Sequence, residues 1–357
     1  MKKILFVIPS LSNGGAEKVV SKISSGLVEK GYDVTILNFY KCENEYSIDD
    51  KVKRITLSSS ENEYEKIGTI KRLRVLRKHI KTINPDEILC FLNHVCIYVF
   101  ISLILTKFRK RITFTERCNP KYSNSKIIKI KNILQRFVKR IVVQNTGQQS
   151  LLSKKDKNKS FVVPNPIDER YLNLETKLNI EPKHIISIGR LDDQKDYPLA
   201  IKAFNNVLKK YPNLIYHIFG KGKDQEKLEK LIKELDLEDK VILEGFTTDI
   251  NKVYENADIY LMTSKFEGMP NALAESMAVG IPSISTDCEF GPSDLIDNEN
   301  MGILFKEHTI EAVEIALLDM IEKYSEYISK SKLVKETMKE RYSLEKITEE
   351  WIKVLEK

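Results

Sequence analysis

The sequence lacks the patterns of small disulfide-bonded or metal-binding domains. Its five cysteines are an odd number and include no Cys-x-x-Cys pair, so a disulfide framework and a zinc knuckle are both disfavoured. The five histidines are scattered at positions 79, 94, 184, 217 and 308, and Asp192 and Asp193 are adjacent instead of alternating. We therefore expect no metal site and no other cofactor.

Long apolar runs are also missing. The first apolar run, residues 4–8, is too short for a secretory signal and predicts a β-strand. The longest stretch, residues 88–106, is divided by Asn93 and His94, and the piece at 95–105 is shorter than the ~20 residues that a membrane-spanning helix needs. A buried strand followed by a buried helix explains this stretch better. We expect a cytoplasmic chain in a reducing compartment.

The length and the pattern of the chain predict two α/β domains. A chain of 357 residues exceeds the size at which one core keeps growing. Short β-like runs alternate with helical patterns from end to end, which is typical of parallel sheets with crossover helices. The strands are expected at residues 3–8, 33–39, 87–91, 111–115 and 140–144 in the first half and at 184–188, 215–219, 240–243, 258–262 and 282–285 in the second.

The domain boundary is expected at residues 164–168, Pro-Asn-Pro-Ile-Asp, because these turn residues interrupt the pattern and a polar stretch follows. The predicted domains are therefore residues 1–168 and 169–342, each doubly wound and Rossmann-like. The amphipathic segment 343–357 is expected to pack back on the first domain. Open parallel sheets bind ligands outside the carboxyl ends of their strands, so two such domains facing each other would hold a ligand in the cleft between them.

Positive charge is concentrated in the first half of the chain. The net charge is +7, yet residues 51–160 hold 26 Lys and Arg against 7 Asp and Glu, which is +19 and leaves −12 for the remainder. Two basic segments, 66–81 and 126–140, have apolar residues at helical spacing, which predicts amphipathic helices that face an anionic membrane or are merely solvated. We expect no nucleic-acid partner, since neither segment has an RNP-like or zinc-finger pattern. The apolar positions are Ile67, Ile70, Leu73, Leu76 and Ile80 in the first segment and Ile127, Ile130, Leu134, Phe137 and Ile141 in the second.

Residues 266–275, Phe-Glu-Gly-Met-Pro-Asn-Ala-Leu-Ala-Glu, place two carboxylates around a small-residue turn. If a helix begins at Asn271, Glu275 lies one turn inside it and Glu267 lies on the loop before it. The amides of Gly268, Met269 and the first helical turn then point at the space between the two carboxylates. An anion with hydroxyl groups on both sides fits that space, as in a nucleotide sugar. A capped surface helix with two solvated acids is the alternative for an isolated pair.

Other loops follow predicted strands and carry groups that suit a phosphate. Gly14 and Gly15 lie at a strand-to-helix turn, where backbone amides can approach an anion, although the loop is not the Gly-x-Gly-x-x-Gly fingerprint of a dinucleotide-binding dehydrogenase. Arg190 and Lys195 follow the strand at 184–188 and could converge on a diphosphate, or could be two surface cations. Gly245 and Phe246 follow another strand and are candidates for a base pocket, although Phe246 could equally be in the core.

Polar residues at strand ends of the first domain are candidates for acceptor binding. Asn93 and His94 interrupt an apolar run just past a strand, where His94 could donate to a sugar hydroxyl or be a buried imidazole. Arg117 and Asn119 occupy the end of the next strand, where Arg117 could meet an anionic acceptor.

These motifs, in this order, resemble retaining glycosyltransferases of family 4, which have the GT-B fold of two Rossmann-like domains. The resemblance runs from the first strand to the last helix. It rests on Gly14-Gly15-Ala16-Glu17, on residues 164–168, on Gly189-Arg190 with Gln194-Lys195, on Phe266-Glu267-Gly268 with Glu275, and on Gly291-Pro292 before Leu295-Ile296.

The resemblance implies a role for each matching residue. Glu275 corresponds to the residue that binds the nucleotide ribose, and Glu267 to the one that contacts hydroxyls of the donor sugar. Arg190 and Lys195 correspond to the pair that holds the diphosphate. The loop of residues 14 and 15 would approach the phosphates or the sugar, His94 would lie at the transferred sugar, and residues 268–271 would line the donor site. Asn93 stands where the family has another residue type before its histidine.

The implied activity is transfer of a hexose or N-acetylhexosamine from a UDP-sugar to a polyprenyl-diphosphate-linked glycan, without a metal, in glycan or polysaccharide assembly at the inner face of a bacterial cell membrane. Two alternatives stay open. One is a UDP-sugar 2-epimerase of the GT-B fold, and the other is a non-catalytic scaffold subunit of a glycan-assembly complex. No second carboxylate is evident at the strand ends of the first domain, so front-face substitution is favoured over a covalent enzyme intermediate.

Overall fold

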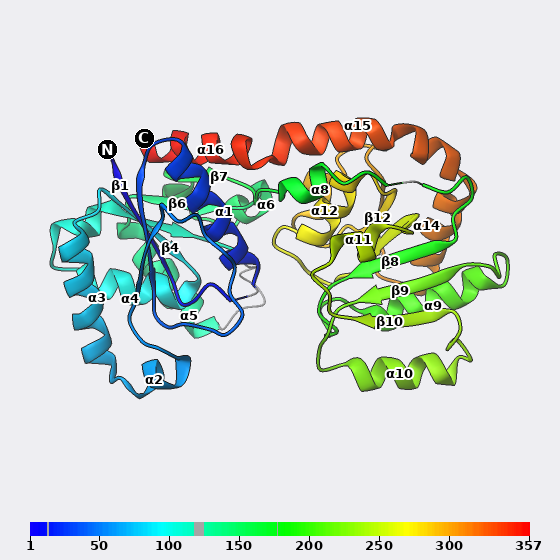
Figure 1. Ribbon diagram of the computed structural model, residues 1–357, viewed down its shortest axis with the longest axis horizontal. Helices are drawn as coiled ribbons and strands as arrows, with labels where there is room; N and C mark the ends of the chain where they lie inside the picture. Colours follow the sequence, from blue (N-terminus) through cyan, green and yellow to red (C-terminus); the bar gives the residue numbers. More distant parts are fainter. Residues whose placement is uncertain (13, 118–124, 177) are drawn as a thin grey trace. The chain divides into compact units, whose positions relative to one another are not determined.

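The computed structural model describes residues 1–12, 14–117, 125–176 and 178–357 (Figure 1). Contacts within the chain divide it into two units. The first consists of Met1–Pro166 together with Leu344–Lys357, and the second is Ile167–Ser343. The prediction from sequence ended the first domain two residues later, at residue 168.

The first unit contains a parallel sheet of seven strands in the order β3-β2-β1-β4-β5-β6-β7. Its central strands are almost entirely buried, as expected for a sheet that is covered on both faces. The strands are β1 (Lys3–Ile8), β2 (Asp33–Asn38), β3 (Lys53–Thr56), β4 (Glu87–Phe91), β5 (Ile112–Thr115), β6 (Arg140–Val143) and β7 (Ser160–Val162).

Helices cover both faces of this sheet. One face packs against α3 and α4 through a core that includes Val7, Leu76 and Val99. On the other face, α16 lies beside α1 (Figure 1), and Trp351 of α16 packs on Phe91 of β4. The helices are α1 (Gly15–Glu29), α2 (Glu61–Lys66), α3 (Thr69–Ile83), α4 (Asn93–Leu103), η1 (Lys107–Arg111), α5 (Ser125–Leu134), η3 (Gln135–Phe137), α6 (Thr146–Ser150), α7 (Lys154–Lys157) and α16 (Leu344–Glu356).

The second unit contains a parallel sheet of six strands in the order β10-β9-β8-β11-β12-β13. Helices α9 and α14 pack on one face around Phe204, Tyr216 and Leu317. The strands are β8 (His184–Ile188), β9 (Ile215–Phe219), β10 (Val241–Gly245), β11 (Ile259–Met262), β12 (Ser283–Thr286) and β13 (Ile303–Phe305). The helices are α8 (Glu169–Leu172), α9 (Tyr197–Leu208), α10 (Gln225–Glu234), α11 (Ile250–Tyr254), α12 (Asn271–Val279), α13 (Pro292–Leu295), α14 (Ile310–Glu322) and α15 (Tyr324–Tyr342).

All ten predicted strands are present, and three further strands were missed. The missed strands β3, β7 and β13 are three to four residues long, and each lies at an edge of its sheet. Edge strands bury less of their surface, so their sequences carry a weaker apolar signal.

The two basic segments form helices, but their apolar residues are not all on the inner side. Ile70 of α3 is 67% exposed, and Ile130 of α5 and Phe137 of η3 are 47% and 56% exposed. The second predicted helix also ends early, because α5 stops at Leu134 and Arg140 opens β6. One inward position on α5 is taken by Lys131, which is buried and forms an ion pair with buried Glu116. Of the predicted stripe, Ile127 and Leu134 are half-buried and Leu134 packs against the core, so helical spacing predicted the core-facing side of this segment only in part.

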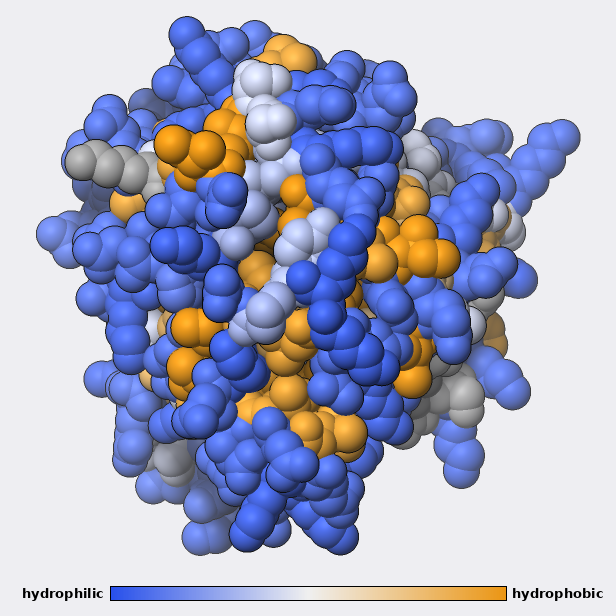
Figure 2. All heavy atoms as spheres, turned by 90° about the vertical axis from the view of Figure 1, so that its right-hand side faces the viewer, coloured by the Kyte–Doolittle hydropathy of each residue, from blue (hydrophilic) through white to orange (hydrophobic). Residues whose placement is uncertain are grey.

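In the face drawn in Figure 2, hydrophobic residues occur in separate groups among hydrophilic ones. No helix in the described part of the chain is long and apolar enough to cross a membrane.

Candidate active site

The second sheet changes its winding direction between β8 and β11. From β8 the chain continues outward to β9 and β10, whereas from β11 it continues to β12 and β13 on the other side. The loops that leave the carboxyl ends of β8 and β11 therefore diverge from neighbouring strands, and such a point is where open parallel sheets bind ligands. The predicted residues Arg190 and Lys195 lie on the first loop, and Glu267 lies on the second.

Lys195 and Glu267 form an ion pair across these two loops. The Lys195 ammonium donates to Oε1 of Glu267 at 2.7 Å, and the two side chains are only 15% and 9% exposed. A pair with so little exposure is weakly screened by solvent, so its geometry is better fixed than that of a surface pair. The structure thus brings together two residues that the sequence analysis placed in one site.

Hydrogen bonds to backbone carbonyls also hold the two loops together. The Gln194 side-chain amide donates to the carbonyl of Phe266 at 2.9 Å, and the Lys265 amide donates to the carbonyl of Gln194 at 2.8 Å. The Thr263 hydroxyl donates to the carbonyl of Lys195 at 3.0 Å. The sequence analysis gave none of these residues a positioning role. Thr263 follows β11 directly, so the strand-end rule applied elsewhere could have indicated it.

Glycines let neighbouring loops approach at two places. A Cβ on Gly220, whose φ is +153°, would lie 1.8 Å from the carbonyl oxygen of Gly189. A Cβ on Gly291, whose φ is +97°, would lie 2.6 Å from both the carbonyl oxygen of Gly268 and Cδ of Pro270. Only glycine fits such backbones without a shift. Gly291 therefore fixes the position of the loop that carries Glu267.

Helix α12 begins at Asn271, as the sequence analysis assumed, and its N-cap residue, Pro270, makes no side-chain capping hydrogen bond. The backbone amides at a helix N-terminus carry partial positive charge, which favours an anion. Glu275 is half-buried one turn inside the helix, where α12 packs on α8. Burial first, and then the Glu275 carboxylate, raise the pKa of Tyr171 on α8, so the tyrosine stays protonated beside Glu275.

Arg190 has a different environment from Lys195. Its side chain is 71% exposed, its guanidinium donates to Oε1 of Gln194 at 2.9 Å, and it pairs with Asp192 at 3.2 Å. Because Gln194 also bonds to the carbonyl of Phe266, Arg190 is connected to the loop of Glu267 through one side chain. Arg190 and Lys195 therefore have different partners in this structure, Gln194 and Asp192 for the first and Glu267 for the second.

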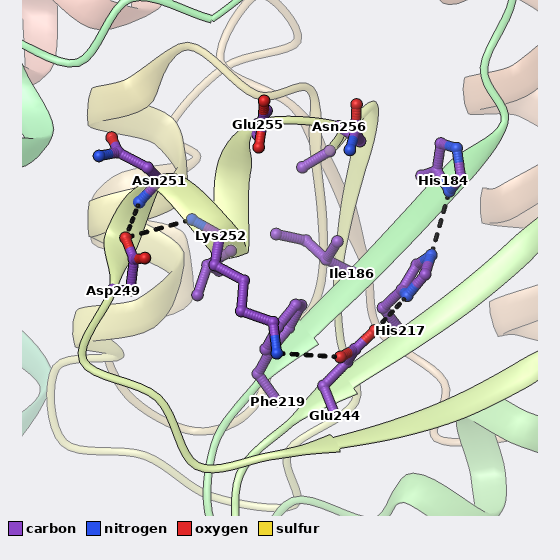
Figure 3. A pocket seen from close by; sticks show the side chains of 12 residues that line it. His184, Ile186, His217, Phe219, Glu244, Asp249, Asn251, Lys252, Glu255 and Asn256 are labelled. Carbon is purple, nitrogen blue, oxygen red and sulfur yellow. Dashed lines mark hydrogen bonds and ion pairs between the residues drawn. The ribbon is translucent and has the colours of Figure 1, made fainter.

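The predicted base-pocket residues lie at the end of β10. Gly245 has a φ of +72° and ends the strand, and Phe246 is 57% exposed. A cavity of about 350 Å³ lies nearby, between strands β8–β10 and the α11 segment (Figure 3). None of the predicted site residues lines it.

A chain of polar contacts runs along that cavity (Figure 3). His184 Nδ1 lies 3.0 Å from His217 Nε2, His217 Nδ1 lies 2.9 Å from Glu244 Oε1, and Lys252 pairs with Glu244 at 3.6 Å. Burial first, and then the neighbouring His217, lower the pKa of His184, so its imidazole is neutral at neutral pH.

In the first unit, Gly14 and Gly15 begin α1 after β1. Gly14 has extended backbone angles and provides no side-chain cap. A Cβ on Gly14 would lie 2.2 Å from Oε2 of Glu17, so the Glu17 side chain folds over this turn. Burial raises the pKa of Glu17. A carboxylate beside the turn weakens its attraction for a phosphate unless Glu17 is protonated or moves.

Asn93 and His94 form the first turn of α4. The side-chain oxygen of Asn93 is buried and accepts no hydrogen bond from any described residue. His94 is exposed to solvent, but desolvation by the protein atoms around its ring lowers the pKa of its imidazole. Leu92, immediately before them, has a φ of +74°, a backbone strain of the kind found at functional sites.

Arg117 lies at the end of β5 but is only 8% exposed. It donates to Oδ1 of Asn165 at 2.9 Å, and its guanidinium stacks on the rings of Phe91 and Trp351 at 5.4 and 5.5 Å. Burial lowers the pKa of Arg117 to about 9, which leaves it charged at neutral pH. The other predicted residue at this strand end, Asn119, lies outside the described residues.

Among the described residues, no group of three or more His, Cys, Asp or Glu side chains could hold a metal ion.

Two family models match this chain in succession. Residues 13–171 match the model described as Glycosyltransferase Family 4, and residues 173–339 match the model described as Glycosyl transferases group 1. The boundary between the matches lies a few residues beyond the boundary between the two units.

Relatives and solved structures resemble the chain along its whole length. It is 28% identical to an uncharacterized glycosyltransferase of Haemophilus influenzae, with 99% of this chain and 100% of the relative covered. It is also 28% identical, with 99% and 98% covered, to a Campylobacter jejuni protein named GalNAc-alpha-(1->4)-GalNAc-alpha-(1->3)-diNAcBac-PP-undecaprenol alpha-1,4-N-acetyl-D-galactosaminyltransferase. The structure of Anabaena HepE in complex with UDP and glucose has a TM-score of 0.80 at 16% identity, over 100% of both chains, and shows a shared fold.

Two parallel-sheet α/β units with these matches define a glycosyltransferase of the GT-B type. More specifically, the chain belongs to the glycosyltransferases that join a family 4 domain to a group 1 domain.

Proposed function

We propose that this protein transfers a hexose or N-acetylhexosamine from a UDP-sugar to a polyprenyl-diphosphate-linked glycan, with retention of anomeric configuration and without a metal ion. The observation that carries the proposal is the 2.7 Å pair of Lys195 and Glu267 beside the N-terminus of α12. The Campylobacter jejuni relative supports the acceptor class, because its name specifies a glycan on PP-undecaprenol. The HepE complex supports the donor class, because it contains UDP and glucose.

Lys195 is suited to bind the donor diphosphate while it keeps its present partner. An ammonium group has three N–H donors, and Glu267 takes one of them. The other two can point at phosphate oxygens. Arg190 adds a second cation, and its exposed side chain can exchange Gln194 and Asp192 for a phosphate without opening the core.

The two carboxylates bind different parts of the donor in this proposal. Glu267 is held by Lys195 through Oε1, so its other oxygen can accept a hydrogen bond from a sugar hydroxyl. Glu275 lies one turn further along, next to Tyr171, and accepts from the ribose hydroxyls. The backbone of residues 268–271 lies between them and lines the donor site, with Gly245 and Phe246 toward the base.

The reaction is a front-face substitution in this proposal. The bond between the anomeric carbon and the diphosphate oxygen breaks while the acceptor oxygen forms its bond on the same face, and the acceptor's proton passes to a diphosphate oxygen. The configuration is therefore retained. Negative charge builds up on the diphosphate, where Lys195, Arg190 and the N-terminus of α12 stabilise it.

The first unit supplies acceptor groups in this proposal. The unpartnered oxygen of Asn93 can accept from a sugar hydroxyl, and His94, whose lowered pKa keeps it neutral, can donate or accept at the transferred sugar. The backbone amides of Gly14 and Gly15 are the groups of this unit that suit a donor phosphate. Arg117 and Asn119 complete the acceptor side, Arg117 by positioning Asn165 and the end of β5. The protein acts at the inner face of the membrane, where its lipid-linked acceptor lies.

The test is a transfer assay with UDP-sugars and a synthetic polyprenyl-diphosphate glycan, in buffer with a metal chelator. We expect a product one sugar heavier, and NMR of the new linkage should show the donor's anomeric configuration. A Lys195→Met variant should be inactive. Conversion of the donor to an isomer of equal mass, with no transfer, would indicate the epimerase, and a donor left unchanged by wild-type protein would indicate a scaffold. A new linkage with inverted anomeric configuration would contradict the front-face mechanism but not the transfer activity.

A further inference from the structure

The first unit exposes a group of large apolar side chains on two neighbouring helices. Fourteen large hydrophobic residues are exposed in the described part of the chain, and six of them lie in α4, α5 and the segments that follow these helices. Helices α4 and α5 are in contact, and Phe100 of α4 packs on Phe137 at 6.4 Å. We call this group the α4–α5 surface. Its members are Ile101 (43% exposed), Ile104 (49%), Leu105 (84%), Ile130 (47%), Ile133 (57%) and Phe137 (56%).

The exposed residues on each helix recur at helical spacing. Ile101 lies in the last turn of α4, and Ile104 and Leu105 follow the helix directly. Ile130 and Ile133 lie three residues apart on α5, and Phe137 follows in η3. The carboxyl end of each helix therefore exposes a group of apolar side chains. A contiguous apolar group of this kind marks a contact site in a protein that has a separate core of its own.

Helix α5 departs from the usual arrangement of a soluble helix at three positions, Ile130, Lys131 and Ile133. Lys131 lies inward, only 5% exposed, and its ammonium pairs with the buried carboxylate of Glu116. Ile130 and Ile133, its neighbours in sequence, point outward. A buried lysine needs a paired carboxylate, and two isoleucines that face water do not contribute the free energy that their burial would provide. An apolar medium on the outer side of α5 would bury these isoleucines and so stabilise the arrangement.

The charge around the α4–α5 surface has one sign. From residue 88 to residue 155 the sequence contains a single carboxylate, Glu116, and that one is buried and paired. Cations flank the apolar side chains and are exposed. They are Lys107 and Lys110 after α4, Lys129 on α5 and Arg136 in η3. The surface therefore combines an apolar centre with a cationic rim, and the helices that form it add no exposed carboxylate.

We infer that the α4–α5 surface inserts into the anionic headgroup region of a lipid bilayer. Aliphatic and aromatic side chains enter the boundary between headgroups and acyl chains, while long Lys and Arg side chains extend to lipid phosphates. The inference rests on the proposed function in one respect. It takes the bilayer that holds the lipid-linked acceptor as the membrane that this surface enters. The inserting surface includes α5 and η3, which form the second of the two basic segments, and adds α4; helix α3, the first basic segment, is not part of it.

Helix α3 is a poorer candidate for insertion although it is more basic. Its one strongly exposed large apolar residue is Ile70. Arg72 is engaged with the protein, because its guanidinium stacks on the ring of Tyr64 at 4.5 Å and donates to the carbonyl of Glu65 at 2.6 Å. Helix α2, which precedes it, also carries three carboxylates that would face the same anionic surface unfavourably.

The experiment is flotation with vesicles of phosphatidylglycerol and phosphatidylcholine in equal parts. The test variant combines Leu105→Gln, Ile133→Gln and Phe137→Gln. The control combines Ile70→Gln, Ile315→Gln and Leu333→Gln, at residues that are 67%, 66% and 50% exposed elsewhere in the chain. All six positions are on the surface, so both variants should fold, which circular dichroism would verify. We expect the test variant to lose at least about tenfold in vesicle affinity, and the control to bind like the wild type.

Equal binding by the test variant and the wild type would overturn the inference. Equal losses of vesicle affinity in the test variant and in the control variant would also overturn it. A wild-type dimer that becomes monomeric in the test variant, with vesicle binding unchanged, would show that a second copy covers the surface. UDP titration of the test variant should match the wild type. If neither the wild type nor the variants transfer sugar, but vesicle binding still depends on the α4–α5 surface, the proposed function is wrong and the inference about the surface stands.

Discussion

Lys195 and Glu267 are 72 positions apart in the sequence, and their side chains form a 2.7 Å ion pair at the carboxyl ends of two neighbouring strands. The contact joins the loop after β8 to the loop after β11. It places one cation and one carboxylate beside the N-terminus of α12, where a diphosphate and a sugar hydroxyl could be bound side by side.

Lys195→Ala should weaken UDP binding by at least about tenfold, because a charge-assisted hydrogen bond to phosphate contributes about 1.5–3 kcal/mol. Calorimetric titration with UDP measures the change. Lys265→Ala is the matched control, because Lys265 also forms an ion pair between the two loops, with Asp193 at 2.6 Å, but not with a residue predicted to bind the donor. The control should bind UDP normally. Equal affinity in Lys195→Ala and the wild type would remove Lys195 from the donor site.

Glu275→Ala should weaken binding of UDP but leave binding of inorganic pyrophosphate unchanged, because the proposed partner of Glu275 is the ribose. Lys195→Ala should weaken both ligands. Titrating each variant with each ligand separates the two roles. Weaker pyrophosphate binding in Glu275→Ala would show that the carboxylate acts on α12 and α8 as a whole, since Glu275 lies against Tyr171.

The same ion pair should contribute to stability. Removing Lys195 alone leaves Glu267, whose side chain is 9% exposed, without its cation, and an unpaired buried charge costs about 3–5 kcal/mol. The double variant Lys195→Met with Glu267→Gln removes both charges and should recover most of that loss in thermal unfolding. It should not recover sugar transfer. A double variant as unstable as the single one would mean that lost packing, and not the unpaired carboxylate, causes the effect.

Gly291→Ala should lower both stability and transfer rate. The new Cβ would meet the carbonyl oxygen of Gly268 and Cδ of Pro270 at 2.6 Å, so the loop of Glu267 must shift. Gly31→Ala is the control, because Gly31 has a similar φ of +85° with nothing within 4 Å. The control should cost only the backbone strain, about 1–2 kcal/mol, and leave the KM for donor unchanged. Equal effects of the two variants on KM would contradict the positioning role of Gly291.

The first unit should lose stability in acid through Glu87. Burial raises the pKa of this carboxyl, but hydrogen bonds and charge from Arg140 and Lys139 outweigh it and hold the pKa below its ordinary 4.5. Since the folded-state pKa is the lower one, the stabilisation is complete above pH 4.5 and is lost as the pH falls through the folded-state value.

Glu87→Gln should therefore flatten the acid dependence of unfolding while lowering stability at pH 7, which urea unfolding at several pH values measures. Glu349→Gln, an exposed position on α16, should behave like the wild type. An acid dependence that Glu87→Gln leaves unchanged would place its origin in other carboxylates.

The sequence predicted the fold well because buried strands carry their own signal. Continuous apolar runs such as β1 and β4 are unmistakable, whereas β3, β7 and β13 are short edge strands whose sequences resemble loops. The burial of Lys131 depends on Glu116, fifteen positions away, and no local pattern reveals such a partner. For that reason, helical spacing could not predict that Lys131 faces inward on α5 while Ile130 is exposed.

The candidate site was predicted in part. The strand-end rule identified Lys195, the small-residue turn before a helix identified Glu267, and the structure places the two in contact. Neither pattern could indicate that Arg190 contacts Gln194 and Asp192, because side-chain direction depends on how the loop folds in space. Gly291 appeared only as part of a motif, and its contact with Gly268 became visible once the two loops were placed in space.

The most direct test of the central claim is calorimetric titration of the wild-type protein with a panel of UDP- and GDP-sugars, in buffer with a metal chelator. The account predicts micromolar binding of one UDP-sugar, with the affinity reduced in Lys195→Ala and Glu275→Ala. Binding of none of the UDP-sugars by a folded protein, or binding that both substitutions leave unchanged, would contradict it.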